Sequence, residues 1–398
     1  MPGRVFVTGI GIICAIGKNT GETLASLKAT RHGIGKLSIL ETVHRDELPS
    51  GEIKLTNEEL AAMAGVTDPD LNPRTALLGM IAAEEALSNA GIDPKDRQMR
   101  TGVISASTVG GMDKTEINYR NYHLGKPYNN FVLTHDCSYS TEQIASRFGF
   151  HDMVSTISTA CSSSANSIMF GARLIKHGML DRVLAGGGDS LSKFTLNGFN
   201  TLKILDRQHC RPFDKNRTGL NLGEGAAFLV LESGKALGKR TPLCELTGYA
   251  NANDAYHQTA SSPDGHGPFL SMKQALGSSG LKPGVIHYVN AHGTGTDNND
   301  LTEGIALERI FGDSIPPVSS TKPFTGHTLG AAAAVEAVIS ILAIQNKMIF
   351  PNLNFNEKID ELHFEPVKQL VTGVELKHVL SNSFGFGGND STLIFSAC

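Results

Sequence analysis

The sequence of 398 residues lacks several features that would place it at once in a class of proteins. Its six cysteines are scattered and form no C-x-x-C pair, so we expect neither a zinc or other metal site nor a disulfide framework, and a reducing, cytoplasmic compartment fits best. A formal net charge of -4 argues against general nucleic-acid binding, which needs a basic face.

Long apolar runs are also missing. The stretch 331–344 carries Glu336 and is too short to span a bilayer. The N-terminal run 5–17 is interrupted by glycines and rich in β-branched residues, and no convincing small-x-small cleavage site follows it. We therefore expect neither a membrane span nor a signal peptide.

Glycine is abundant instead. The chain has 43 glycines, more than the usual ~7%, which predicts many tight turns or close approaches of the backbone. A hydrophobic fraction of 40% and a charged fraction of 19% are ordinary for a protein that buries a sizeable core. The length allows two or three domains, or one large duplicated unit.

Patterns typical of strands and helices alternate along the chain. Strands are predicted at 5–8, 101–106, 154–159, 182–188, 226–232 and 286–290. Helices are predicted at 22–28, 74–89, 141–148, 168–175 and 270–278. The polar stretches 41–73 and 113–140 are expected to be excursions over the surface. This alternation indicates parallel sheets covered by helices.

The first predicted strand runs into G-I-G-I-I-C-A-I-G, which resembles part of a dinucleotide fingerprint. Cys14 replaces the third glycine of that fingerprint, and no acidic residue ends a clear second strand about twenty residues later. A tight turn from strand to helix explains these glycines better than a nucleotide site does.

Cys161 stands between a β-branched run, V-S-T-I-S-T, and a helical pattern that begins after small residues. This order predicts strand, sharp turn and helix, with the thiol at the helix start. Free N–H groups and the helix dipole would there lower the pKa of the thiol toward thiolate formation. A buried structural cysteine is the alternative for Cys161 taken alone.

Two features suggest an internal duplication. A helix, an (S/A)-G-(I/L)-x-P turn and a strand follow one another at 89–104 and again at 278–290. A strand, small residues and a helix surround Cys161, and the same pattern surrounds His327 at 318–344. We predict two halves, residues 1–240 with Cys161 and residues 241–398, whose sheets stack on shared helices with a site at their seam. Chance similarity of strand–helix units remains the alternative.

Two histidines of the second half end predicted strands in glycine-framed loops. His292 lies in N-A-H-G-T-G-T-D, and Lys322 precedes His327 by five positions in S-S-T-K-P-F-T-G-H. A single histidine is more often a structural hydrogen-bonding group, but two beside a helix-capped cysteine indicate catalysis. The S-x-x-K at 319–322 lacks the partner motifs of a penicillin-binding nucleophile.

The segment N-S-F-G-F-G-G-N-D at 382–390 is expected to form a glycine loop that bears Phe384 and Phe386. It fits either a hairpin turn or a gate. Its glycines also allow backbone N–H groups to point into a cavity, as an oxyanion hole requires.

The chain resembles the elongating β-ketoacyl-acyl-carrier-protein synthases of the thiolase superfamily over essentially its whole length. The resemblance depends on six motifs in family order: V-T-G-x-G, T-A-C-S-S, R-P-F-D-K-x-R-x-G with G-E-G, N-A-H-G-T-G-T-D, S-S-T-K-P-F-T-G-H-T-L-G-A-A and N-S-F-G-F-G-G. It implies an α/β fold of five α-β-α-β-α layers, with two duplicated halves and mixed, mostly parallel sheets. It also implies a homodimer or, as an alternative, a heterodimer with a related subunit.

The resemblance implies a decarboxylative Claisen condensation in fatty-acid or polyketide synthesis, without a free cofactor, because acyl carrier protein brings both substrates on phosphopantetheine. Cys161 would carry the acyl group, His292 and His327 would stabilise the enolate, and the N–H groups of Cys161 and Phe386 would hold the tetrahedral oxyanion. The remaining family positions are Lys322 and Glu336, which organise the site, Thr294 and Thr296, which bind pantetheine, and Val109 and Phe386, which line and gate the acyl pocket.

The details favour elongation over related reactions. A degradative thiolase would have a second cysteine in the C-terminal glycine loop, an initiating synthase would use asparagine in place of His327, and a non-catalytic partner subunit would lack Cys161. That partner subunit and a cysteine hydrolase remain the alternatives.

Three departures from the family pattern allow a specialised pathway, such as polyene or type II polyketide assembly. Asp297 replaces a proline, the C-terminal loop reads G-G-N-D rather than G-G-T-N, and acidic residues stand at 68 and 70, where relatives often carry docking lysines. The candidates for carrier docking are therefore Arg74, Lys126 and Arg207.

Overall fold

Two sets of five strands with the same internal order form the centre of the structure, a computed structural model that describes residues 3–126 and 132–398. The first set runs in the order β3-β2-β4-β5-β1 and the second in the order β8-β7-β11-β12-β6. The strands are β1 (Val5–Cys14), β2 (Thr101–Ala106), β3 (Met153–Ile157), β4 (Arg182–Asp189), β5 (Gly225–Ser233), β6 (Cys244–Asn253), β7 (Tyr288–Asn290), β8 (Val318–Ser319), β11 (His378–Gly385) and β12 (Asn389–Ser396).

The directions of the strands repeat as well as their order. In each set the first three strands of the order are parallel, and the remaining pairings are antiparallel. The prediction of two duplicated halves with mixed sheets is therefore confirmed. The sheets are not mostly parallel, however, because each half has two parallel and two antiparallel strand pairings. The two sets also touch, because β1 pairs with β6 at two residue pairs, so hydrogen bonding makes one ten-stranded sheet.

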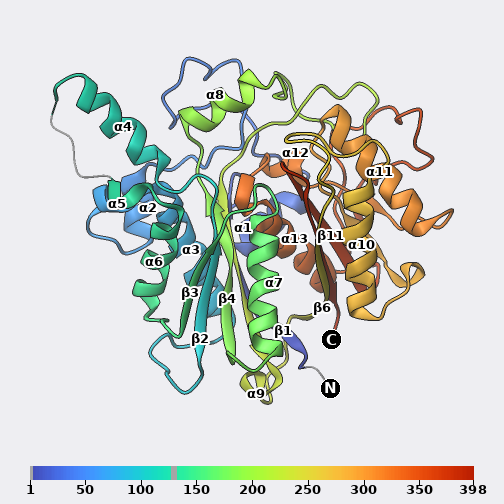
Figure 1. Cartoon of the computed structure of the whole chain (residues 1–398), viewed down its shortest axis with the longest axis horizontal. Coiled ribbons are helices and arrows are strands. Elements are labelled where there is room, and N and C mark those ends of the chain that lie inside the picture. The colour runs from blue at the N-terminus through green and yellow to red at the C-terminus, as the bar shows by residue number, and fades with distance from the viewer. Residues whose placement is uncertain (1–2, 127–131) are drawn as a thin grey trace.

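Helices complete the layers on both sides of the two half-sheets (Figure 1). In the described part of the chain they are α1 (Thr20–Lys28), α2 (Asn57–Met63), α3 (Arg74–Asn89), α4 (Met112–His123), α5 (Val132–His135), α6 (Cys137–Phe148), α7 (Ser163–Lys176), α8 (Lys193–Thr201), α9 (Gly234–Leu237), α10 (His266–Ser279), α11 (Asp297–Phe311), α12 (Lys322–Thr325) and α13 (Ala332–Asn346). Short 3-10 turns lie at Pro69–Leu71, Pro283–Val285 and Leu329–Ala331, and β9 (Met348–Ile349) pairs with β10 (Val371–Thr372).

Three apolar clusters show the order of the layers. The largest joins α7 and α13 to strands of both half-sheets, so these two helices form the shared middle layer. A second cluster packs α3 and α6 on the outer face of the first half-sheet, and a third packs α10 and α11 on the outer face of the second. This gives the five predicted layers.

The position of α13 in the middle layer explains why this helix is so apolar. The segment Leu329–Asn346 has a mean hydropathy of 1.6 and reaches 18 residues, which is long enough to cross a membrane by length and composition alone. However, 89% of that segment is buried inside the protein, because half-sheets cover α13 on both sides. A helix that is apolar all round is expected at such a position.

The prediction that Gly9 and Gly11 form a tight turn after the first strand was wrong. β1 does not end at residue 8 but continues to Cys14, with an irregularity between Val7 and Gly9. The glycines lie against α3, where a Cβ on Gly11 would come within 2.0 Å of the carbonyl oxygen of Ala82. They therefore permit a close strand–helix approach rather than a turn.

Both polar excursions contain helices that the sequence analysis missed. Residues 41–73 include α2, whose capping box joins Thr56 and Glu59 at its start. Residues 113–140 include most of α4, all of α5 and the start of α6, which begins at Cys137 and not at residue 141. The polar composition of α4 hid it, because little of it is buried.

Candidate functional site

The nucleophile candidate lies on a strained turn between β3 and α7. Ala160 has a φ of 52°, a left-handed conformation that costs free energy for a residue with a Cβ. The Ser163 hydroxyl stabilises the turn: it accepts a hydrogen bond from the Thr159 N–H at 2.8 Å and donates to the Ala160 carbonyl at 2.6 Å. Cys161 is thus presented just before the first turn of α7, as predicted.

The second half repeats this arrangement before α13. Gly326 has a φ of 74°, His327 follows it, and Leu329 has a φ of 55° at the start of the short 3-10 turn that leads into the helix. His327 therefore occupies in the second half the place that Cys161 occupies in the first.

One cavity of about 270 Å³ brings these residues together. Cys161, His292, His327, Phe384 and Phe386 all line it, although they come from widely separated parts of the chain. The two imidazole rings lie nearly perpendicular, at 86°, with their centroids 5.3 Å apart. A small substrate group in this cavity would contact the thiol and both rings.

Lys322 determines which nitrogen of His292 carries the proton. Its Nζ lies 3.1 Å from His292 Nδ1 and 2.5 Å from the His292 carbonyl oxygen, and it also pairs with Glu336. A lysine ammonium has donors only, so Nδ1 accepts and the ring proton is on Nε2. His292 therefore offers an Nε2–H donor.

His327 has the same tautomer for a different reason. The backbone N–H of Leu329 donates to His327 Nδ1 at 3.2 Å, which leaves Nε2 as the protonated nitrogen. Burial and the nearby charge of Lys322 hold the pKa of both His292 and His327 well below 6.5. Both rings are therefore neutral near pH 7, and each presents one N–H donor.

The pKa prediction for the thiol was wrong. Burial raises the pKa of Cys161 to about 11, although the charge of Lys322 and a hydrogen bond from the Phe386 N–H oppose the rise. The helix start is present, but the thiol is only 6% exposed, and the free energy of desolvating a thiolate outweighs those favourable contacts. The resting thiol is therefore protonated.

The C-terminal glycine loop closes over the nucleophile. It is the turn of the β11–β12 hairpin, and a Cβ on Gly385 would come within 3.0 Å of the Cys161 backbone nitrogen. The Phe386 ring stacks on Phe199 of α8 at 5.9 Å and 15°. The predicted hairpin is confirmed, and Phe386 lines the cavity; its role as a gate stays a prediction.

Comparison with known proteins decides the family. The model described as "Beta-ketoacyl synthase, N-terminal domain" matches residues 3–236, and the model of the C-terminal domain matches residues 243–356. The chain belongs to the β-ketoacyl synthase family. It is 31% identical to "3-oxoacyl-[acyl-carrier-protein] synthase 2" of Staphylococcus aureus (strain N315) over 98% of both chains.

Solved ketosynthase structures agree with this assignment. "The ishigamide ketosynthase/chain length factor" matches with a TM-score of 0.94 at 29% identity over the full length of both chains. A type II polyketide synthase structure, AntDE:AntF, described as an acyl-carrier protein in complex with its ketosynthase, matches with a TM-score of 0.87 at 26% identity, again over both full chains. The predicted thiolase-like fold and acyltransferase class are confirmed.

The other residues expected from the β-ketoacyl synthase pattern lie at different depths. Thr294 and Thr296 line the cavity, and their hydroxyls lie 2.9 Å apart. Glu336 is buried beside Lys322, and burial raises its pKa to about 7 although the Lys322 charge lowers it. Val109, expected to line the acyl pocket, is not among the residues that line this cavity; it lies in an apolar cluster with Leu220, which does line it.

Two buried carboxylates that the sequence analysis overlooked organise this synthase site. Glu303 accepts the backbone N–H groups of His292 and Gly293, at 2.9 and 2.8 Å, and burial raises its pKa to about 7. Asp189, at the end of β4, accepts the N–H groups of Val109 at 3.0 Å and of Gly330 at 2.7 Å. Neither carboxylate could be recognised from its position in the sequence, because only the tertiary fold brings it to the backbone groups that it contacts.

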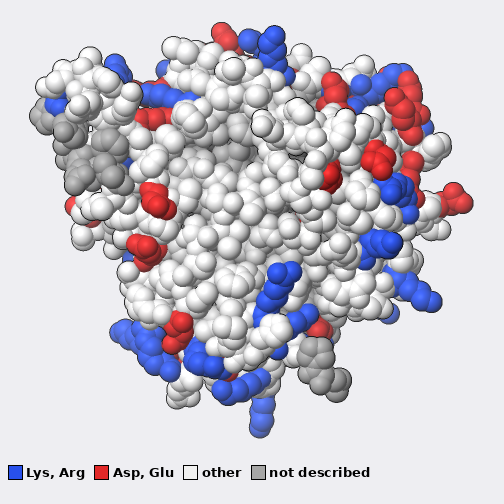
Figure 2. Space-filling view, viewed as in Figure 1, with Lys and Arg blue, Asp and Glu red and all other residues white. Residues whose placement is uncertain are grey.

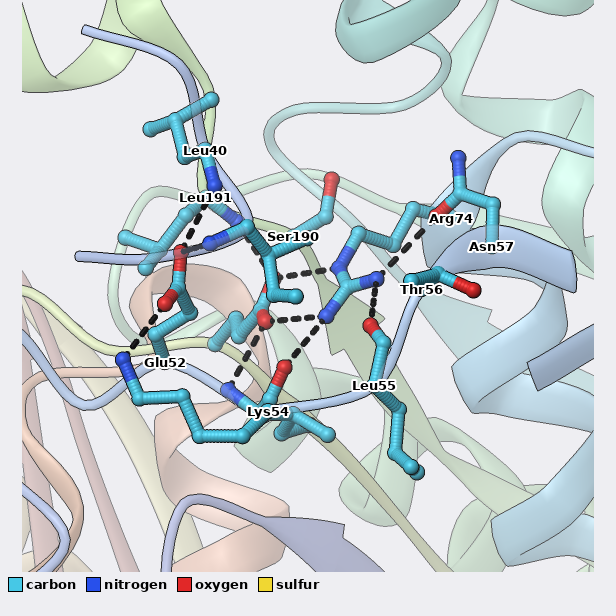
Figure 3. A network of polar contacts seen from close by, with 12 residues as sticks. Leu40, Glu52, Lys54, Leu55, Thr56, Asn57, Arg74, Ser190 and Leu191 are labelled. Atoms are coloured by element: carbon cyan, nitrogen blue, oxygen red, sulfur yellow. Dashed lines mark hydrogen bonds and ion pairs between the residues drawn. The ribbon is translucent and has the colours of Figure 1, made fainter. Parts of the chain in front are cut away.

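The structure removes one of the three docking candidates. Arg74 is 5% exposed, and its guanidinium donates to Glu224 and to backbone carbonyls of the preceding loop, including that of Leu55 (Figure 3). It is a buried structural residue. Lys126 is exposed beside the undescribed residues, and the Arg207 side chain is 68% exposed and pairs with Glu47 at 3.2 Å.

Within residues 3–126 and 132–398, no group of three or more histidine, cysteine or acidic side chains could hold a metal ion.

Proposed function

We propose that this β-ketoacyl synthase joins an acyl group held on Cys161 to the carbon chain of malonyl-carrier protein. The observation that supports the proposal most strongly is the shared cavity, in which a thiol faces two neutral imidazoles that each have an Nε2–H donor. Two N–H donors and a nucleophile beside one cavity are what an enolate condensation on a thioester requires.

In the first step, the Cys161 sulfur attacks the carbonyl carbon of the acyl-carrier thioester. A new C–S bond forms and the bond to the phosphopantetheine sulfur breaks, and the thiol proton leaves with the departing thiol. The backbone N–H groups of Cys161 and Phe386 would hold the tetrahedral oxyanion. Because the Phe386 N–H contacts the Cys161 sulfur at rest, it is already directed at the reacting atoms.

In the second step, malonyl thioester loses CO₂, and the electron pair of the broken C–C bond becomes an enolate. The Nε2–H groups of His292 and His327 would donate to the enolate oxygen, while Lys322 keeps His292 in the donor tautomer. The enolate carbon then attacks the acyl carbonyl on Cys161. A C–C bond forms, the C–S bond breaks, β-ketoacyl-carrier protein is released, and the Cys161 thiolate takes a proton from solvent.

The residues near the cavity opening suggest a path for the phosphopantetheine arm of the carrier. Thr294 and Thr296 would contact pantetheine, and the adjoining surface depressions continue through Thr218 and Arg207 to a basic depression. That depression includes Lys36, Arg207 and Arg211, and also Asp46, which pairs with Lys36 at 3.0 Å. We propose it as the docking surface for the acidic carrier. The carrier would supply the phosphopantetheine, so no separate cofactor is expected.

The partner subunit and compartment are part of the same proposal. A large part of the face in Figure 2 is free of charged side chains, which suits a protein partner. One structural relative is described as a ketosynthase/chain length factor, so a homodimer and a heterodimer with a related subunit are both candidates. We also propose that the protein is cytoplasmic and that its two halves divide near residue 240.

Mass spectrometry of the intact protein tests the function. Incubation with a panel of acyl-carrier proteins should add one acyl mass on Cys161, and malonyl-carrier should then convert the adduct to β-ketoacyl-carrier protein. Cys161→Ala should abolish the adduct. Free acid as the product would indicate a hydrolase, and absence of any adduct with every carrier tried would favour the non-catalytic partner subunit.

A further inference from the structure

Asp390 is a buried carboxyl group at the start of β12. It is the second residue of that strand, close after the hairpin turn that bears Phe386, and only 1% of it is exposed. Among the residues that the structure describes, neither of its side-chain oxygens has a hydrogen-bond partner. An orphaned carboxyl group in a folded core needs an explanation, because burying an unpaired charge costs several kcal/mol. It also stands at the position where the sequence departs from the G-G-T-N pattern.

The groups that face Asp390 make its charge still less favourable. Asp254, just beyond β6, accepts the backbone N–H groups of Tyr256 at 3.1 Å and Ser262 at 2.9 Å. Asp254 and Glu303 of α11 both act on Asp390 as like charges. With burial as the main cause, they raise the pKa of Asp390 to about 8.

The remaining neighbours do not compensate this charge. On β11, Phe384 is the register partner of Asp390, and on β6 its register partner is Ala252. Gly267, in the first turn of α10, lies so close that a Cβ there would come within 1.9 Å of Asp390 Oδ2 and 2.6 Å of Asp254 Cβ. The two acidic side chains therefore meet at one point. A proton on Asp390 is the simplest compensation.

The contact between the Asp390 and Asp254 side chains lies where two walls of the cavity meet. The hairpin turn contributes Phe386 and its neighbours, and the loop after β6 contributes Thr259 to the same cavity. Backbone hydrogen bonds connect the two walls, from Asp254 N–H to the Gly388 carbonyl at 3.2 Å and from Gly387 N–H to the Gln258 carbonyl at 2.8 Å. A new charge on Asp390 would act directly on this connection.

We propose that Asp390 is a protonation-dependent positioning residue of the Phe386 hairpin. In its neutral form it allows the hairpin to close against the loop 254–262. Loss of its proton places a second negative charge beside Asp254, separates the two walls and opens the cavity. What the cavity binds rests on the proposed function, whereas the movement itself does not.

A fluorescence titration tests this without measuring activity. The chain has no tryptophan, and Tyr256, which is 57% exposed on the loop beside Asp254, accepts a reporter as Tyr256→Trp. Emission between pH 5.5 and 9.5 should change with a midpoint near 8. In the double variant Tyr256→Trp/Asp390→Asn, which keeps the shape but cannot ionise, this transition should be absent. The same transition in both proteins would overturn the proposal.

A second variant tests the direction in which the titration midpoint moves. Asp254→Asn in the reporter protein removes the nearest like charge, so the midpoint should move to lower pH, and an unchanged or higher midpoint would contradict the mechanism. This variant also serves if Asp390→Asn does not fold. Repeating the titration with added K⁺ or Mg²⁺ should leave the midpoint in place. A large cation-dependent fall that requires Asp390 would show a metal site instead, and would overturn the protonation mechanism.

Discussion

Replacement of Lys322 by methionine separates the roles of charge and shape at the centre of the site. Methionine has a similar length but no donor, so Lys322→Met removes the contacts to His292 Nδ1, to the His292 carbonyl and to Glu336. It should not leave a buried charge behind, because the pKa of Glu336 is already about 7 and rises further without the lysine charge. Glu336 would therefore be protonated at neutral pH.

The expected loss follows from the His292 tautomer. Without the Lys322 ammonium, nothing fixes the proton of His292 on Nε2, and the enolate loses one preorganised donor. A hydrogen bond that involves a charged group is worth about 1.5–3 kcal/mol, which corresponds to a decrease of about 10- to 100-fold in the decarboxylation rate. Removal of the cation also raises the pKa of Cys161 above its present value of about 11, so acyl transfer should become slower as well.

The assay is the release of CO₂ from malonyl-carrier protein in the absence of an acyl donor, with acylation of Cys161 followed separately by mass spectrometry. Lys347→Met is the matched control, because this exposed lysine pairs with Glu375 on the surface. Its rates should equal those of the unchanged protein. If Lys322→Met folds and releases CO₂ within about twofold of the unchanged rate, the assignment of the His292 tautomer is refuted.

Three further predictions test the burial of particular groups. Arg74→Met should lower the free energy of unfolding by about 3–5 kcal/mol in a urea titration, because the buried Glu224 carboxylate loses its cation and keeps the N–H groups of Ile53 and Leu191. Arg207→Ala should change it by less than about 0.5 kcal/mol and raise the KM for the carrier. Alkylation of Cys161, followed by peptide mass spectrometry, should accelerate about tenfold per pH unit from pH 7 to 10, since its pKa of about 11 keeps the thiolate scarce; a plateau near pH 8 would contradict this. Gly11→Ala should destabilise the protein by more than about 2 kcal/mol because its Cβ would meet α3, whereas Gly277→Ala, with open space in α10, should be neutral or slightly stabilising.

The sequence predicted the turns of the site better than its electrostatics. The strand, turn and helix around Cys161 and around His327 are local, and their small residues and periodicity indicate them directly. The pKa of the Cys161 thiol is a tertiary property, because it depends on how completely the hairpin turn at Phe386 covers the sulfur. A pattern that places a thiol at a helix start cannot give the extent of that cover.

Tertiary packing also explains the other wrong predictions. Gly9 and Gly11 suggested a turn because glycine allows one, but here they make room for α3 from a distant part of the chain. Arg74 suggested a surface charge, because a guanidinium is rarely buried without a partner. Its partner, Glu224, lies 150 residues away, so the pair was invisible in the sequence.

The duplicated halves contribute different chemistry from equivalent places. Both present a functional side chain on a strained turn before a middle-layer helix, a sulfur in the first half and an imidazole in the second. Asp189 of the first half contacts the second half, because its carboxylate accepts N–H groups from Val109, in the loop after β2, and from Gly330, in the short 3-10 turn after His327. The distance between Cys161 and His327 is thus determined by the contact between the halves and by neither half alone. A half produced separately would lack the site, since the donors proposed to orient an enolate and the sulfur proposed to hold the acyl group come from opposite sides of this contact.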